Sequence, residues 1–200
     1  MPWGGGRRGR VWTSLGLMTV LHLVGALALA LALVLDTGEA RAADVAPEPA
    51  LKAEFMERIT RYVDWPDDSF ASENAPFTVC LVGDSPFADY LARMAKERKI
   101  QGRRIAVARV SEITVLGGCN LVFVARSEDK RLDKILAETA DHPVLTVGDS
   151  NGFGARGVLV NFYRDGDNVR FEINVRAVDR SGLRFSSKIL RLARILGKRP

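Results

Sequence analysis

One glycine-rich segment has the spacing of a nucleotide-binding loop. Gly152, Gly154 and Gly157 satisfy the pattern G-x-G-x-x-G, and Glu172 lies 20 residues after Gly152. In dinucleotide-binding proteins a helix follows these glycines, and its N-terminal amides bind the pyrophosphate. Here the residues that follow, 158–164, predict a β-strand. The sequence therefore favours a loop between strands whose glycines permit unusual backbone angles, and it predicts no cofactor.

Other catalytic and metal-binding patterns are weak. His142 is the single histidine after residue 42, and one histidine cannot supply a zinc ligand set or a Ser-His-Asp relay. The acidic clusters at 67–68 and 165–167 fall in predicted loops, where carboxylates commonly cap or solvate the backbone. We therefore predict no catalytic residue, no metal site and no enzymatic activity. An exported hydrolase that uses a pair of loop carboxylates is the enzymatic alternative.

The two cysteines are more informative, because each belongs to a predicted strand. Cys80 lies in the middle of the first strand and Cys119 at the start of the third, so they can meet only if these strands are neighbours. That arrangement implies the strand order 2-1-3-4, numbered along the chain. A bridge over 38 intervening residues would stabilise an exported protein by about 4 kcal/mol in the chain-entropy treatment. Two buried free thiols are the alternative.

The segments around these residues alternate between helix and strand. Apolar residues at 51, 55, 59 and 62 predict a helix over 50–65 with this face toward the core, ended by Pro66. Strands separated by helices imply a parallel sheet, although the connection over 111–119 is short for a crossover. Buried strands are predicted at 77–83, 105–110, 120–125 and 144–148, and further helices at 86–99 and 127–140.

The pattern changes after Gly157. Strands at 158–164 and 169–175 flank turn residues 165–168 and predict an antiparallel hairpin. In its second strand Phe171 and Ile173 alternate with Glu172, so one face is expected to be buried and the other polar. A last helix is predicted from Ser186 or Ser187, with core residues Ile189, Leu190, Leu192, Ala193 and Leu196. The predicted fold class is α/β, a three-layer sandwich with a mostly parallel sheet and a hairpin at one edge.

The first 42 residues have the organisation of an export signal. Three arginines precede an uncharged apolar run over 11–35, and Ala-Arg-Ala at 40–42 fits a signal peptidase site. We predict cleavage after Ala42. The run of 25 residues is also long enough to span a bilayer, so an uncleaved anchor is the alternative. In both cases the remaining chain lies outside the cytoplasm, where thiols can oxidise.

The rest of the chain reads as a short linker over 43–50 and one domain over 51–197. Residues 43–200 carry 25 basic and 22 acidic side chains. No basic cluster alternates with stacking aromatic residues, so we predict no nucleic-acid partner. Membrane contact is expected only through the leader or through a partner.

Several segments resemble the YfiR-like family of exported regulatory proteins, over about residues 51–196. They are Ile-Thr-Arg-Tyr-Val-Asp-Trp-Pro at 59–66, Val-Cys-Leu-Val-Gly-Asp at 79–84, Cys-Asn-Leu-Val-Phe at 119–123, Pro-Val-Leu-Thr-Val at 143–147, Phe-Gly-Ala-Arg-Gly at 153–157, and a closing block over 169–193. The resemblance implies a Rossmann-like α/β sandwich, a homodimer, and a disulfide between Cys80 and Cys119. The second cysteine pair of some members is absent from this chain.

The resemblance also implies a function. YfiR-like proteins are periplasmic negative regulators without enzymatic activity, and YfiR itself holds an inner-membrane diguanylate cyclase inactive by contacting its periplasmic region. Cyclic di-GMP then stays low and biofilm formation is restrained. The expected partner is therefore such a cyclase or another membrane signalling protein. A periplasmic small-molecule-binding protein that serves a sensor kinase or transporter is the alternative.

Two surfaces are candidates for the partner interface. The first is aromatic and consists of Tyr62, Trp65 and Phe70, which would act as anchors if their rings were exposed. The alternative is that these rings pack into the core. The second is a basic stripe on the last predicted helix, suited to acidic side chains or lipid headgroups, unless it is merely a solvated face. Its members are Lys188, Arg191, Arg194 and Lys198.

Overall fold

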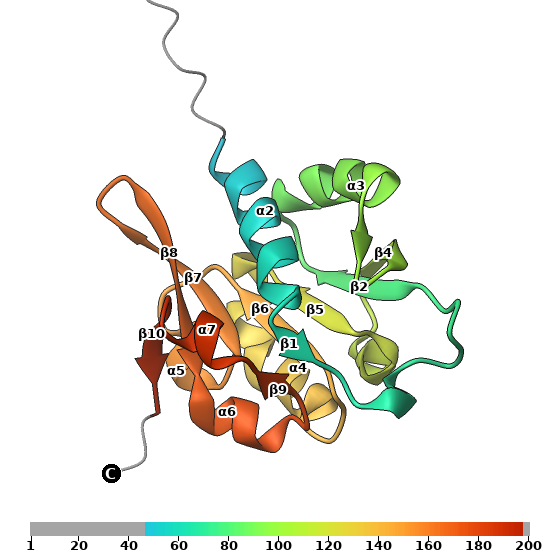
Figure 1. Ribbon diagram of the computed structural model, residues 1–200. Coiled ribbons are helices and arrows are strands. Elements are labelled where there is room, and N and C mark those ends of the chain that lie inside the picture. Colours follow the sequence, from blue (N-terminus) through green and yellow to red (C-terminus); the bar gives the residue numbers. More distant parts are fainter. Residues whose placement is uncertain (1–46, 198–200) are drawn as a thin grey trace, which may run out of the picture. The chain divides into compact units, whose positions relative to one another are not determined.

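The computed structural model describes residues 47–197 (Figure 1). The predicted leader over 1–42, linker residues 43–46 and Lys198 lie outside the described residues. The main element is an eight-stranded sheet in the order β10-β8-β7-β6-β5-β2-β4-β3. Its strands are β2 (Phe77–Val82), β3 (Lys99–Ile100), β4 (Arg103–Val110), β5 (Leu121–Val124), β6 (Leu145–Gly148), β7 (Val160–Asp165), β8 (Asn168–Asn174) and β10 (Arg194–Leu196).

Helices connect these strands, and a second, two-stranded sheet lies apart from them. The small sheet pairs β1 (Val63–Asp64) with β9 (Arg184–Phe185) in antiparallel register. The α-helices are α2 (Glu48–Thr60), α3 (Phe87–Glu97), α4 (Leu132–Thr139), α5 (Phe153–Arg156), α6 (Val175–Arg180) and α7 (Ser187–Leu190). Three 3-10 helices are η1 (Asp67–Ser69), η2 (Ile113–Gly118) and η3 (Arg126–Arg131).

The central topology agrees with the sequence prediction. Strands β4, β2, β5 and β6 are neighbours in this order and run parallel, which confirms the order 2-1-3-4. The hairpin β7–β8 follows β6 in the sheet, and its two strands are antiparallel. The carboxyl ends of β5 and β6 therefore meet at one edge of the sheet, where parallel α/β folds place their binding crevices.

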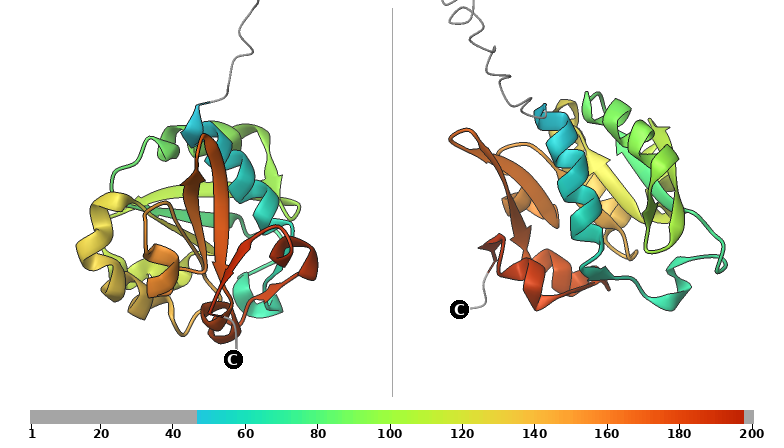
Figure 2. Two further views of the ribbon diagram at one scale, coloured as in Figure 1. Left: turned by 90° about the vertical axis from the view of Figure 1, so that its left-hand side faces the viewer. Right: turned by 45° about the horizontal axis from the view of Figure 1, so that its top comes forward.

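The sheet separates two hydrophobic cores, as a three-layer sandwich requires. Side chains alternate along β2, so that Val79 and Leu81 belong to one core while Cys80 and Val82 belong to the other. Helices α2 and α3 lie side by side over the first core (Figure 2). Helix α4 closes the second core with Leu132 and Ile135.

Helix α2 is rotated from the predicted orientation, although Ile59 is in the core as expected and Phe55 packs against it. Ala53, Met56 and Ile59 are in the core, whereas Leu51 and Phe55 are half-buried and Tyr62, beyond the end of the helix, is exposed. The helix starts at Glu48 and ends at Thr60, because the chain then enters strand β1. The prediction was wrong at Leu51 and Tyr62, because the contact of α2 with the sheet and α3, not apolar spacing alone, fixes the rotation of the helix.

The end of the chain also departs from the prediction. The expected long last helix is wrong: α7 has only 4 residues, and Arg194–Leu196 form strand β10, parallel to β8. Pairing with β8 supplies partners for the backbone of this segment, and this outweighs its weak local preference for helix. Consequently Leu192, expected in the core, is 71% exposed.

Candidate functional site

The disulfide joins a strand to the connection that crosses it. Cys80 on β2 and Cys119 at the end of η2 are bonded, with their Cα atoms 6.0 Å apart. The chain leaves β4, passes through η2 and enters β5, while β2 lies between these two strands. This connection, over 111–119, is the one that is short for a crossover. The disulfide bonds its end to β2. Both cysteines are buried in the second core, so this bond is a structural element.

The glycine-rich loop is explained by a buried carboxylate. Glu172 on β8 is only 3% exposed and accepts hydrogen bonds from Asn161 Nδ2 at 2.9 Å and from Arg194 Nε at 2.9 Å. A Cβ at Gly154 would come within 2.5 Å of Glu172 Oε1. Gly154 is therefore required for packing. Gly152 precedes the 4-residue helix α5, and its φ of 84° lies in the region that favours glycine. Glu172 binds protein groups here, and the expectation of a polar hairpin face was wrong at Glu172 and Asn174 because helix α5 packs on them.

Replacing Gly154 with alanine tests this packing. The new methyl group would press on a carboxylate that Asn161 and Arg194 hold in place, so we expect a loss of about 1–3 kcal/mol in the free energy of unfolding. Urea denaturation followed by circular dichroism measures it. Gly118→Ala is a matched control, because Gly118 is exposed, has no positive φ and has open space where its Cβ would lie. A loss at Gly154 no larger than the loss at Gly118 would contradict this account.

The predicted aromatic surface is divided by the fold. Trp65 is 8% exposed, contacts Phe77 edge to face and donates a hydrogen bond from Nε1 to Asn120 O. Phe70 is half-buried, and the guanidinium of Arg103 lies 3.8 Å from the centre of its ring. Tyr62 is 38% exposed. Of these three rings, the ring of Tyr62 is therefore the one exposed to solvent.

The predicted basic stripe is divided as well, since its members do not share one helix. Lys188 on α7 and Arg191 just after it are exposed. Arg194 belongs to β10, and its hydrogen bonds to Glu172 raise the pKa of the guanidinium above its ordinary value. Lys198 is outside the described residues. Arg194 therefore has a structural partner, whereas Lys188 and Arg191 have no ion pair within residues 47–197.

The structure brings the remaining members of both surfaces together. Ser186 donates a backbone hydrogen bond to Tyr62 O at 2.9 Å, and its hydroxyl caps the start of α7. Tyr62 thus lies beside the helix that carries Lys188 and is followed by Arg191 and Leu192. We call Tyr62, Lys188, Arg191 and Leu192 the α7 surface. The pairing of β1 with β9 that creates it had no signal in the sequence, because each strand has only 2 residues.

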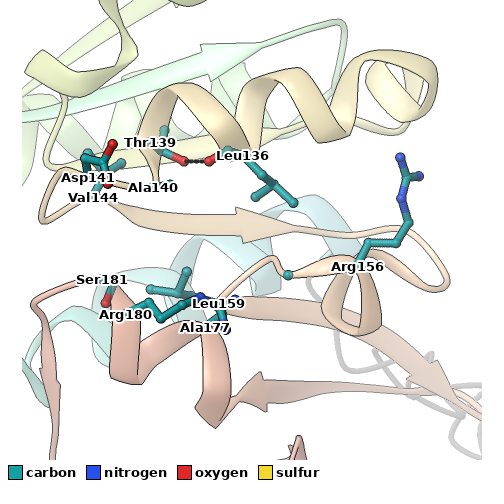
Figure 3. Close-up of a pocket in the computed structure, with 11 residues that line it drawn as sticks. Leu136, Thr139, Ala140, Asp141, Val144, Arg156, Leu159, Ala177, Arg180 and Ser181 are labelled. Atoms are coloured by element: carbon teal, nitrogen blue, oxygen red, sulfur yellow. Dashed lines mark hydrogen bonds between the residues drawn. The ribbon is translucent and has the colours of Figure 1, made fainter.

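A cleft of about 240 Å³ opens between the end of α4 and helix α6 (Figure 3). Its walls include Leu136, Val144 and Leu159, and Thr139 Oγ1 is occupied by a hydrogen bond to Leu136 O. Arg156 extends away from the cleft toward Asp129 and Asp133. The other hydroxyl of this lining, Ser181 Oγ, donates a hydrogen bond to Val178 O at 2.9 Å.

Within residues 47–197, no three side chains of His, Cys, Asp or Glu lie close enough together to hold a metal ion. The helices of the same range are too short or too polar to cross a membrane.

A crystal structure of a conserved domain protein from Vibrio cholerae O1 biovar El Tor has a similar fold, with a TM-score of 0.55 and 9% identity over 74% of this chain. This chain spans 60% of that protein. The ABC domain from Streptococcus pneumonia in complex with L-Trp has a TM-score of 0.48 and 10% identity, over 74% of this chain and 62% of that one.

Similarity in sequence identifies the family. The YfiR/HmsC-like family matches residues 49–194 of this chain. This range contains the disulfide, the buried Glu172 and the α7 surface. The match covers most of the chain and nearly the whole of the described domain. This chain belongs to the YfiR/HmsC-like family.

Proposed function

We propose that this protein is an exported repressor that binds the periplasmic region of an inner-membrane diguanylate cyclase and lowers cyclic di-GMP signalling. Membership of the family indicates a periplasmic regulator of diguanylate cyclase and a regulatory, non-catalytic role. This match over residues 49–194 is the observation that carries the proposal. Export by the leader over 1–42 would bring the domain to its partner.

The α7 surface is our candidate for the contact with the cyclase. Tyr62 and the 71% exposed Leu192 offer apolar contact area, and aromatic residues are common anchors of interfaces. Lys188 and Arg191 lie three residues apart, so they share one side of the α7 turn. Neither charge is neutralised within the described part of the chain. This combination fits a partner surface with apolar residues surrounded by carboxylates.

Charge reversal of this surface should release the cyclase. We expect Lys188→Glu/Arg191→Glu to weaken binding about 30-fold or more, since loss of interface hot spots costs about 2 kcal/mol or more. The test measures cyclic di-GMP in cells that lack the native gene, keep their own membrane diguanylate cyclases and express each variant. The expected result is a rise toward the level without repressor.

The matched control is Lys130→Glu/Lys134→Glu. It makes the same change of charge at two exposed lysines on η3 and α4, which belong to the opposite layer of the sandwich. We expect this variant to repress normally. Repression lost equally in both variants would place the contact elsewhere, and repression kept in both would remove the α7 surface from the proposal.

We also propose that the protein acts as a homodimer, as the resemblance to YfiR-like proteins implies. Sedimentation equilibrium of the purified protein measures its mass in solution directly. A mass of two chains is the expected result, and a mass of one chain at micromolar concentration would contradict it.

A further inference from the structure

One edge of the eight-stranded sheet is open over most of its length. Strand β4 pairs with β2 on one side through residues 105–110, whereas on the other side β3 pairs with it only at Arg103 and Arg104. No hydrogen bond within residues 47–197 reaches the backbone of residues 105–110 from that outer side. Figure 1 shows this end of the sheet on the side opposite the hairpin β7–β8. An open edge of this kind is a template for pairing with another strand.

The backbone groups of Val107 and Arg109 point outward from this edge. On β2 the Thr78 carbonyl accepts a hydrogen bond from Asn120 N, on the β5 side. Because alternate residues of a strand direct their hydrogen bonds to opposite sides, Val79 bonds to β4. Val79 lies opposite Val107 in parallel register, so its partners are the residues on either side of Val107. The N–H and C=O groups of Val107, and by the same alternation those of Arg109, therefore have no strand to pair with in the described domain.

The sequence of this edge lacks the features that keep sheets apart. Natural sheets protect their edges with proline, lysine, bulges or very short strands. Residues 105–110 are Ile-Ala-Val-Ala-Arg-Val, and their register with β2 is continuous. Val107 and Ala108 are only half-buried, and Val115 on η2, which follows β4 in the chain, is 55% exposed. The edge thus offers apolar surface together with free backbone groups.

The charges at the two ends of this edge fit a second copy of the same strand. Lys99 and Arg104 are exposed and lie directly opposite each other in the β3–β4 hairpin, where like charges are destabilising. Glu112 is exposed just beyond the other end of β4. None of these three side chains has an ion pair within residues 47–197. Antiparallel pairing of two β4 strands would bring Glu112 of each copy to the two basic side chains of the other, which is charge complementarity.

We propose that two copies of this protein pair through their β4 edges, antiparallel and about a twofold axis at Ala108, so that the sheet continues from one copy into the other. Such an interface uses the same patch of both subunits, as a twofold dimer requires. Val107 of each copy exchanges backbone hydrogen bonds with Arg109 of the second copy. The proposal rests on the homodimer proposed above and specifies its interface, which shares no residue with the α7 surface.

Val107→Pro tests the backbone pairing. Proline removes the outward N–H of this residue and leaves the bonds to β2, a position that edge strands tolerate, whereas its ring would meet the second copy. Sedimentation equilibrium of the purified protein gives the Kd of the dimer, which we expect to weaken about 100-fold or more. Val107→Thr is the matched control, because it keeps the N–H and a β-branched side chain, and it should leave Kd unchanged. Circular dichroism shows that each variant is folded.

An exchange of charges tests the antiparallel register. Arg104→Glu should weaken the dimer about 5- to 20-fold, since two opposite-charge contacts become like-charge contacts, and Glu112→Arg should do the same. Arg104→Glu/Glu112→Arg restores opposite charges across the interface and should recover most of the affinity. In one chain these residues stand at opposite ends of β4, so recovery can come only from the second copy. Lys134→Glu, at an exposed lysine on α4, is the control and should leave Kd unchanged.

The outcomes separate this interface from the homodimer itself. A dimer that Val107→Pro and the charge variants leave unchanged would overturn the β4 interface and keep the homodimer. A mass of one chain for the unmodified protein would overturn both. If Val107→Pro does not fold, the charge exchange decides, and the absence of recovery in the combined variant would overturn the assignment. An unchanged dimer with loss of repression in Val107→Pro would assign this edge to the cyclase and would overturn it equally.

Discussion

Cys80→Ser is expected to lower the melting temperature under oxidising conditions and to leave it unchanged under reducing conditions. The bridge closes a loop with a sequence separation of 39, which corresponds to about 4 kcal/mol in the chain-entropy treatment. For a domain of this size the decrease should be about 8–16 °C. Thermal unfolding of protein and variant, each with and without dithiothreitol present from refolding onward, measures it.

The position of the bridge explains why its loss should be large. Both sulfur atoms lie in the second core, and the bond holds the end of η2 against the strand that this connection crosses. Cys119→Ser and the double variant should match Cys80→Ser, since each removes the same bond. If the unmodified protein melts at the same temperature with and without reductant, the bridge contributes nothing and the account is wrong at this point.

Arg194→Met is expected to lower the free energy of unfolding by about 2–3 kcal/mol. Removing one partner of a buried ion pair costs about 3–5 kcal/mol, and we reduce this figure because the Arg194 side chain is half exposed. The Glu172 side chain is 4% exposed, against 52% for Arg194. The variant would leave this carboxylate with the amide of Asn161 as its remaining donor. Urea denaturation at neutral pH measures the loss.

Two further variants separate the buried charge from general effects of the substitution. Arg191→Met changes an exposed arginine three residues earlier and should cost less than about 0.5 kcal/mol. Glu172→Gln combined with Arg194→Met removes the uncompensated charge and should recover part of the lost stability. A double variant less stable than Arg194→Met alone would show that the carboxylate is not the cause.

The central sheet could be predicted because its signals are local and repeated. The strands around Cys80 and Cys119 are continuous apolar runs, and the requirement that two cysteines meet fixed the neighbours of the first strand. Helix and strand types need only the spacing of apolar residues along the chain. For this reason β2, β4, β5 and β6 were predicted correctly in type and order.

The elements that create the α7 surface could not be predicted in this way. Strands β1, β9 and β10 have 2 or 3 residues each, and they exist because distant segments pair. The apolar residues at 189–196 fit a helical period, yet partners on β8 decide their structure. Helix α5 packs on Glu172 and makes it a buried residue, and the pairing of β10 with β8 makes Arg194 its counter-ion.

The most direct test of the proposed function is binding between two purified proteins. Protein purified after expression of the full chain is titrated into the periplasmic region of each inner-membrane diguanylate cyclase of the same organism, and association is followed by isothermal titration. The account predicts saturable binding that Lys188→Glu/Arg191→Glu weakens about 30-fold and Lys130→Glu/Lys134→Glu leaves unchanged. No binding by the unmodified protein, with cyclic di-GMP in cells unaffected by its loss, would contradict it.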